Sequence, residues 1–185
     1  MDVTPPTEIQ TPDGRRLPVR PEWGEACAKT VHWFDPPAAA AAGLSGLEVM
    51  QATIDGTIAA APMDLLLEMW PTAAEAGRVV FQCRPDRSMY NTAGVVQGGL
   101  VCTMLDSAAA CAVWTTLEAG FGFTSIDITV NFLRPVTVAS GPLVATGIVT
   151  KPGRRVALAT AEVVDAAGRT VAMGSSNCLI IPPAD

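Results

Sequence analysis

Residues 91–114 read NTAGVVQGGLVCTMLDSAAACAVW, and this stretch decides the fold of the chain. It begins with the turn-forming residues Asn91 and Gly94 and passes through a glycine pair into a long apolar run. From residue 100 to residue 114 the run contains neither glycine nor proline. The stretch therefore predicts a helix over residues 99–114 that is apolar nearly all round and, for that reason, buried.

Asp106 is the single charge within the predicted helix. Ionised side chains are seldom buried without a partner, because their desolvation costs several kcal/mol per ion. Two interpretations follow. Asp106 is either a structural acid, which accepts a hydrogen bond from Ser107 or from a neighbouring strand, or a functional carboxylate in a pocket.

The glycine pair Gly98-Gly99 precedes the helix and lets the backbone approach a ligand closely. The free N–H groups of a first helical turn are suitable donors for a developing oxyanion. Alternatively, the two glycines do no more than allow a sharp turn between the loop and the helix. Gly98 and Asp106 are eight residues apart, about 12 Å along a helix axis. A small reacting group cannot contact both within one chain, so a shared site predicts a two-fold dimer in which the partner supplies Asp106.

Length and composition predict one domain that associates with itself. The chain has 185 residues, of which 49% are hydrophobic and 16% are charged, against about 25% charged residues in typical globular proteins. A chain with so few charged residues is expected to bury part of its surface in an interface between subunits. The net charge of −6 argues against a nucleic-acid partner, which needs a basic surface, but it allows a local basic patch for a phosphorylated ligand.

The sequence also argues against export, membrane insertion and metal chemistry. The first ten residues lack the apolar core of a signal peptide, and Asp106 interrupts the longest apolar run. The five cysteines are odd in number and widely spaced, which indicates reduced thiols in a cytoplasmic protein. Because His32 is the only histidine in the chain, a zinc site or a Ser-His-Asp triad is disfavoured. We therefore expect no cofactor.

Residues 1–43 form a Pro- and Ala-rich lead segment, which we expect to be partly docked or partly disordered. Trp23, Trp33 and Phe34 suggest that part of it docks. Residues 44–185 are expected to form a single domain.

The domain is predicted to be α+β. Ser45 and Glu48 form a capping box that starts a first helix, and Gly56 ends it. Residues 125–132 alternate strictly between polar and apolar side chains, which predicts a continuous half-buried strand. The expected strands are residues 63–70, 79–84, 125–132, 143–150, 156–165 and 170–180. The last four would form an antiparallel meander around the central helix, with an open edge that can pair with a second copy.

Several motifs together resemble one family, the PaaI-type hotdog-fold thioesterases, which hydrolyse acyl- or aryl-coenzyme A thioesters. The family pattern N-x-x-G-x-x-H-G-G, followed on the helix by D-x-A, corresponds here to Asn91, Gly94, residues 97–99 and residues 106–108. The segments NFLRPV (131–136) and GRRVA (153–157) are also similar. The resemblance covers roughly residues 46–180 and implies the hotdog fold, an antiparallel sheet wrapped around a long central apolar helix.

The resemblance implies a role for each matching residue. The Gly98 N–H would polarise the thioester carbonyl, and Asp106 of the partner subunit would act as nucleophile or as general base on water. Asn91 would orient that water or hold the loop. Gln97 stands where the family has histidine; it can donate and accept hydrogen bonds but cannot titrate near neutral pH.

The resemblance also implies substrate-binding residues. Gly99 and Ser107 adjoin the catalytic motif. Ser125, Arg154 and Arg155 would hold the coenzyme A phosphates, although the two arginines could equally be a solvated hairpin tip. We expect an apolar pocket wall from Val101, Met104 and Leu105, facing across the dimer interface.

The sequence thus predicts an acyl-CoA thioesterase that works as a homodimer or as a dimer of dimers. The alternative is a weakly active or non-catalytic acyl-CoA-binding dimer. Hydration of an enoyl-CoA is disfavoured, because that reaction typically relies on an Asp–His pair and His32 lies in the lead segment.

Overall fold

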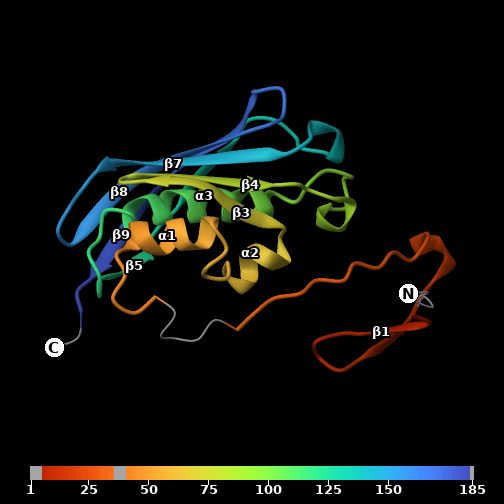
Figure 1. Ribbon diagram of the computed structural model, residues 1–185. Helices are drawn as coiled ribbons and strands as arrows, with labels where there is room; N and C mark the ends of the chain where they lie inside the picture. The colour runs from red at the N-terminus through yellow and green to blue at the C-terminus, as the bar shows by residue number, and fades with distance from the viewer. Residues whose placement is uncertain (1–5, 36–40, 184–185) are drawn as a thin grey trace. The chain divides into compact units, whose positions relative to one another are not determined.

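The computed structural model describes residues 6–35 and 41–183 (Figure 1). The chain divides into two compact units, residues 1–31 and residues 32–185. In the first unit β1 (Glu8–Gln10) pairs antiparallel with β2 (Arg16–Pro18), and the 3-10 helix η1 (Pro21–Trp23) follows. The sequence did not predict this small hairpin. Docking of the lead segment stays a prediction, and its residues 1–5 and 36–40 lie outside the described part.

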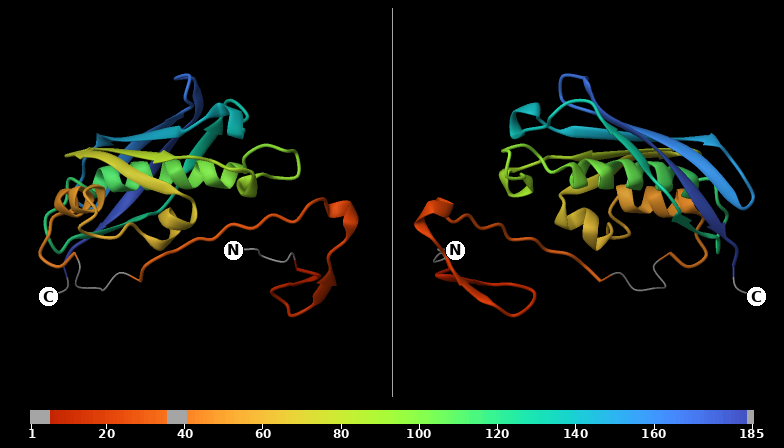
Figure 2. Two further views of the ribbon diagram at one scale, coloured as in Figure 1. Left: turned by 45° about the vertical axis from the view of Figure 1, so that its right-hand side comes forward. Right: turned by 180° about the vertical axis from the view of Figure 1, so that it is seen from behind.

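The second unit carries the central helix and a seven-stranded antiparallel sheet of order β3-β4-β7-β8-β9-β5, in which β6 also pairs with β9. The sheet curves over one side of the central helix α3, and α1 and α2 lie on its other side (Figures 1 and 2). Its elements are the helices α1 (Gly46–Ile54), α2 (Pro62–Leu66) and α3 (Gly98–Trp114), the 3-10 helices η2 (Arg87–Met89) and η3 (Val138–Ser140), and the strands β3 (Met69–Glu75), β4 (Arg78–Cys83), β5 (Gly122–Ser125), β6 (Thr129–Phe132), β7 (Leu143–Lys151), β8 (Val156–Val164) and β9 (Thr170–Ile181).

The first helix begins as predicted. The Ser45 hydroxyl accepts a hydrogen bond from the Glu48 N–H, and the Glu48 carboxylate accepts one from the Ser45 N–H. This reciprocal capping box satisfies two N–H groups that a helix start otherwise leaves without acceptors.

The strand predicted at residues 63–70 is wrong. Pro62 occupies the first turn of α2, where its fixed φ favours a helix. Glu68 has a φ of 50° and turns the chain, so that β3 begins only at Met69. Pro71 lies inside β3; this is tolerated because β3 is an edge strand and its register shifts just after the proline.

The continuous strand predicted at residues 125–132 is also wrong. It is split into β5 and β6, because residues 126–128 lie opposite only two residues of β9, Ser176 and Asn177. The extra residue is a β-bulge, which the Asp127 carboxylate holds by accepting hydrogen bonds of 3.0 and 2.8 Å from the backbone and the side chain of Asn177. Both strands pair with β9 and not with β7, so only β7, β8 and β9 form a meander.

The central helix was predicted correctly, and its large apolar side chains face the sheet. α3 packs against β4, β7, β8 and β9. The two backbones approach closely at Gly147 of β7, where an added Cβ would lie 2.0 Å from the carbonyl oxygen of Ala108. Met104 and Leu105 are fully buried and Val101 is 3% exposed. The predicted pocket wall is therefore wrong for Met104 and Leu105, which fill the core instead of facing a partner.

Candidate active site

The loop before α3 is fixed by hydrogen bonds at both of its ends. The Asn91 Oδ1 accepts from the Ala93 N–H at 2.9 Å and from the Val95 N–H at 3.4 Å. The Gln97 N–H donates to the carbonyl oxygen of Met89 at 2.8 Å. Asn91 therefore stabilises the loop through its side chain, which is one of the two roles considered for it. The Gln97 bond fixes the residue that precedes the helix.

Gly98 is the first residue of α3, and Gln97 precedes it without a side-chain capping bond to the helix. The N–H groups of a first turn have no acceptor within their own helix, so they are available to a ligand. A cavity of about 290 Å³ adjoins this end of the helix. Its lining consists of Val95, Val96, Gly98, Val101, Phe132, Leu133, Arg134, Pro135 and Val136. The Phe132 ring crosses so close to Gly98 that an added Cβ would lie 3.2 Å from its Cζ.

Asp106 lies farther along α3 and is held by the neighbouring sheet. The Ser125 hydroxyl at the end of β5 donates a 2.7 Å hydrogen bond to Asp106 Oδ1. A bond from a neighbouring strand is one of the partners that a structural acid would have. It also fixes one carboxylate oxygen and leaves the other for chemistry, so the contact is compatible with both interpretations of Asp106.

One stripe of α3 is only partly covered within the chain. Its members recur at helical spacing and are small or polar before the final tryptophan: Gly99, Cys102, Thr103, Asp106, Ser107, Cys111 and Trp114. Seen from the helix axis, the stripe lies opposite the buried apolar face. Gly98 and Asp106 remain separated along the helix as the sequence implies, so a single chain does not bring them together at one small group.

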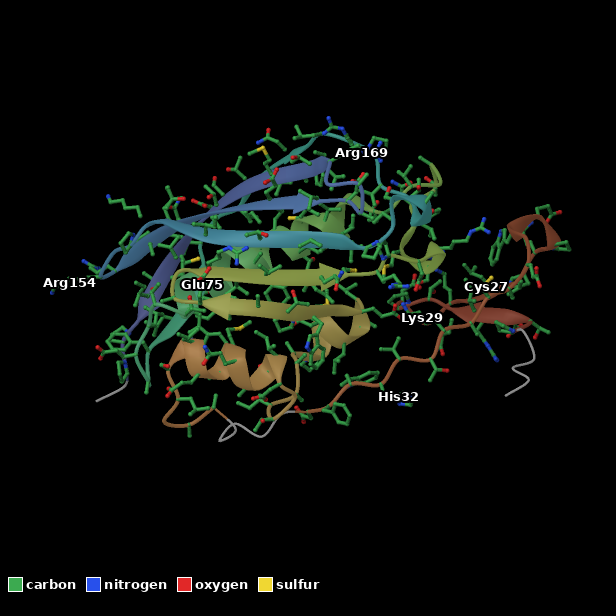
Figure 3. All side chains as sticks on the ribbon, turned by 45° about the horizontal axis from the view of Figure 1, so that its top comes forward. Cys27, Lys29, His32, Glu75, Arg154 and Arg169 are labelled. Carbon is green, nitrogen blue, oxygen red and sulfur yellow. The ribbon has the colours of Figure 1, made fainter. Side chains whose placement is uncertain are left out.

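The proposed phosphate-binding residues fall into two places. Arg154 and Arg155 are exposed in the turn between β7 and β8, and Arg154 extends from that turn in Figure 3. Arg154 also lines a second cavity of about 440 Å³ at the carboxyl end of α3, together with Thr116, Leu117, Glu118, Phe121, Gly153 and Ile180. Arg155 does not line this second cavity. Ser125 lies elsewhere, where its hydroxyl is hydrogen-bonded to Asp106.

Two groups with raised pKa values, Asp64 on α2 and Cys111 on α3, were not singled out by sequence reasoning. Burial raises the pKa of Asp64, on α2, to about 6. Burial, together with the nearby charges of Asp64 and Asp106, raises the pKa of the Cys111 thiol to about 12. No sequence pattern pointed to Asp64, because the segment that carries it was expected to be a strand.

Across residues 6–35 and 41–183, no group of three or more His, Cys, Asp or Glu side chains could bind a metal ion. No helix in the same residues is long and apolar enough to span a membrane.

Comparison with known proteins finds similarity to thioesterases. Residues 93–172 match the sequence model of the thioesterase superfamily. The chain is 25% identical to mouse acyl-coenzyme A thioesterase 13 over 103 residues, which are 55% of this chain and 72% of the mouse protein.

Solved structures show the same fold. The PaaI protein from the phenylacetic acid degradation operon of E. coli superimposes with a TM-score of 0.66 at 21% identity, covering 76% of this chain and 99% of that protein. A thioesterase family protein from Silicibacter pomeroyi superimposes with a TM-score of 0.65 at 25% identity, covering 72% and 98%. These matches confirm the predicted hotdog architecture and the resemblance to the thioesterases, and they support thioester hydrolysis as the activity.

Proposed function

We propose that this protein hydrolyses an acyl- or aryl-coenzyme A thioester, and that each active site is shared between two subunits. The observation that carries the proposal is the spacing on α3. The donor end at Gly98 and the bonded carboxylate of Asp106 lie on the same helix, too far apart for one thioester. Two copies packed antiparallel along the partly covered stripe of α3 bring Gly98 of one to Asp106 of the other.

Gly98 supplies the electrophilic half of this site. Its N–H points out of the first turn of α3, beside the cavity of about 290 Å³. A carbonyl oxygen that accepts this N–H becomes more negative in the transition state, and a donor fixed in advance stabilises that charge. Gln97 lies next to the carbonyl and can brace it or the loop with its amide.

Asp106 supplies the other half. As nucleophile its carboxylate attacks the carbonyl carbon and expels the coenzyme A thiolate, and water then hydrolyses the resulting acyl-aspartyl anhydride to the acid and the free carboxylate. As general base it takes a proton from the water that attacks the carbonyl carbon, and the thiolate leaves as the tetrahedral intermediate collapses. In both cases the Ser125 hydroxyl, bonded to one oxygen, keeps the second oxygen aimed at the substrate. Asn91 Oδ1 is occupied by the loop, so only its Nδ2 could reach a water. The proposed reaction requires no metal or redox cofactor.

Coenzyme A is proposed as the thiol part of the substrate, because the mouse relative is named an acyl-coenzyme A thioesterase. The exposed guanidinium of Arg154, at the edge of a second cavity, is suited to a phosphate. Arg155, Gly99 and Ser107 stay candidate substrate contacts. A further pairing of two dimers into a tetramer is compatible with the exposed sheet face, on which Ile148 and Met173 are about half exposed.

The test is release of free thiol from a panel of aryl-, short-chain and long-chain acyl-CoA thioesters, with Asp106→Asn as the near-isosteric blank. We expect turnover of one substrate class, reduced at least about 1,000-fold in the variant. Wild-type turnover that Asp106→Asn leaves unchanged would contradict the assigned role.

A second candidate function rests on Gln97. A protein that binds acyl-CoA without hydrolysing it fits a site in which the family histidine has been replaced. Binding of coenzyme A esters without turnover, together with a large gain of turnover in Gln97→His, would favour this function.

A further inference from the structure

The cavity beside Gly98 lies between two segments that are far apart in the sequence. Val95, Val96 and Gly98 line it from the loop before α3 and from the first turn of that helix, and we call them the loop wall. Residues 132–136 line it from the end of β6 and the chain that follows, and we call them the strand wall. A carbonyl group that reaches the Gly98 N–H through this cavity has to fit between the two walls. Their separation therefore decides how well the donor is aligned.

Two hydrogen bonds join the loop wall to the chain of the strand wall. The Val96 N–H donates to the carbonyl oxygen of Val136 at 2.8 Å, and both residues are buried. The second bond comes from a side chain, because the Tyr90 hydroxyl accepts from the Val138 N–H at 2.7 Å, two residues beyond the strand wall. Val138 is the first residue of η3. An N–H at the start of a helix has no acceptor within that helix, so Tyr90 supplies one.

The backbone of Tyr90 belongs to the base of the loop before α3. It forms an isolated antiparallel bridge with Val96. The Gln97 N–H donates at 2.8 Å to the carbonyl oxygen of Met89, the residue before Tyr90, and the half-buried Tyr90 ring packs against the core. One aromatic side chain thus connects the base of the loop, shortly before Gly98, with the far end of the strand wall.

Tyr90 is not one of the described residues that line the cavity. Its hydroxyl therefore acts on a bound thioester only through the two walls. If the bond to Val138 were purely structural, its loss would lower stability and leave turnover unchanged. If it sets the separation of the walls, its loss displaces Gly98 relative to the carbonyl, and a displacement of about 1 Å can cost about 100-fold in rate.

We propose that Tyr90 is a positioning residue for the thioesterase reaction: its hydroxyl fixes the strand wall against the loop wall and thereby aligns the Gly98 N–H with the thioester carbonyl. This inference rests on the proposed function, because it takes Gly98 as the oxyanion donor. The donor stabilises negative charge that develops in the transition state. Its misalignment therefore lowers kcat more than it raises KM.

The experiment removes the Tyr90 hydroxyl and keeps the ring, in the variant Tyr90→Phe. The matched control is Thr115→Val. The Thr115 hydroxyl also accepts from a distant backbone N–H, that of Gly77 at 2.8 Å, but it does so at the carboxyl end of α3. With the best thioester of the panel, we expect Tyr90→Phe to lower kcat about 10- to 100-fold and to leave KM within about 3-fold of the wild type. The control should keep kcat within about 2-fold.

Amide hydrogen exchange, followed by NMR, supplies a readout that needs no turnover. Tyr90→Phe should speed exchange about 10-fold or more at the N–H groups of Val138 and Val96 and leave that of Gly77 unchanged. Thr115→Val should speed exchange at Gly77 and leave Val96 and Val138 unchanged.

The proposal is overturned if Tyr90→Phe keeps the wild-type kcat, or if both variants lose the same share of it. Unchanged exchange at Val96 in Tyr90→Phe overturns it in every case. If the wild type hydrolyses none of the thioesters, the proposed function fails, and exchange at Val96 alone decides whether Tyr90 holds the two walls together.

Discussion

The Ser125 hydroxyl donates a 2.7 Å hydrogen bond to Asp106 Oδ1, and thereby joins the end of β5 to the middle of α3. The bond exists because β5 ends at Ser125 and the bulge begins immediately after it. A hydrogen bond to a charged carboxylate contributes about 1.5–3 kcal/mol. The contact fixes the orientation of the proposed catalytic group within its own subunit.

Ser125→Ala is expected to lower kcat about 10- to 100-fold with a smaller effect on KM, because Asp106 loses the donor that orients it. Thr124→Ala is the matched control, because the side chain of this exposed neighbour donates to the carbonyl oxygen of Ser125, at 3.4 Å, and not to Asp106. Steady-state kinetics on the best substrate measures both variants. Equal losses in the two variants would show that the strand, and not the Ser125–Asp106 bond, is responsible.

Asp64→Asn is expected to stabilise the protein at neutral pH. The folded protein holds a proton on Asp64 up to a pKa of about 6, while the unfolded chain releases it near the ordinary value of 3.8. The free energy of unfolding therefore falls as pH rises from about 4 to about 6, and the deficit persists above pH 6. The variant lacks this deficit, so it should gain up to about 3 kcal/mol at pH 7.5 and little near pH 4.

Urea unfolding at both pH values measures this difference. Asp55→Asn serves as a control of opposite sign, because hydrogen bonds from Thr57 hold the pKa of Asp55 below its usual range. That variant should lose stability at pH 7.5. An Asp64→Asn protein no more stable than wild type at pH 7.5 would refute the raised pKa of this carboxyl.

Gly147→Ala is expected to destabilise the fold by about 3 kcal/mol or more, because the new methyl group would lie 2.0 Å from the carbonyl oxygen of Ala108 and push α3 off the sheet. Gly122→Ala is the control on another strand, where the nearest atom to the added Cβ is 3.6 Å away. Its effect should stay near 0.5 kcal/mol. Similar midpoints for the two variants in thermal unfolding would argue against the close helix–sheet packing.

The sequence predicted the elements whose pattern depends on local chemistry. The capping box at Ser45 and the central helix both follow from residue type and spacing. The failures occurred where tertiary structure overrides a pattern. Alternation over residues 125–132 gave no sign of the bulge at Asp127, which depends on hydrogen bonds from Asn177 in a distant strand.

The candidate site divides in the same way. Gly98 and Asp106 could be identified from the motif and from their spacing, because both lie on one helix. The pairing of Ser125 with Asp106 could not be identified, since it depends on the register between β5 and β9. Asp64 was missed because its burial arises from the packing of a helix that the sequence suggested was a strand.

The central claim is that each active site combines Gly98 of one subunit with Asp106 of the other, and co-expression of two inactive variants tests it most directly. Asp106→Asn removes the carboxylate. Gly98→Pro removes the N–H donor at the first position of α3, where proline is compatible with a helix. Each variant alone should be nearly inactive. Mixed dimers carry one intact site of two, so an equal mixture should recover about a quarter of the wild-type thioesterase activity. No recovery, in mixtures shown by two affinity tags to contain mixed dimers, would contradict the shared site.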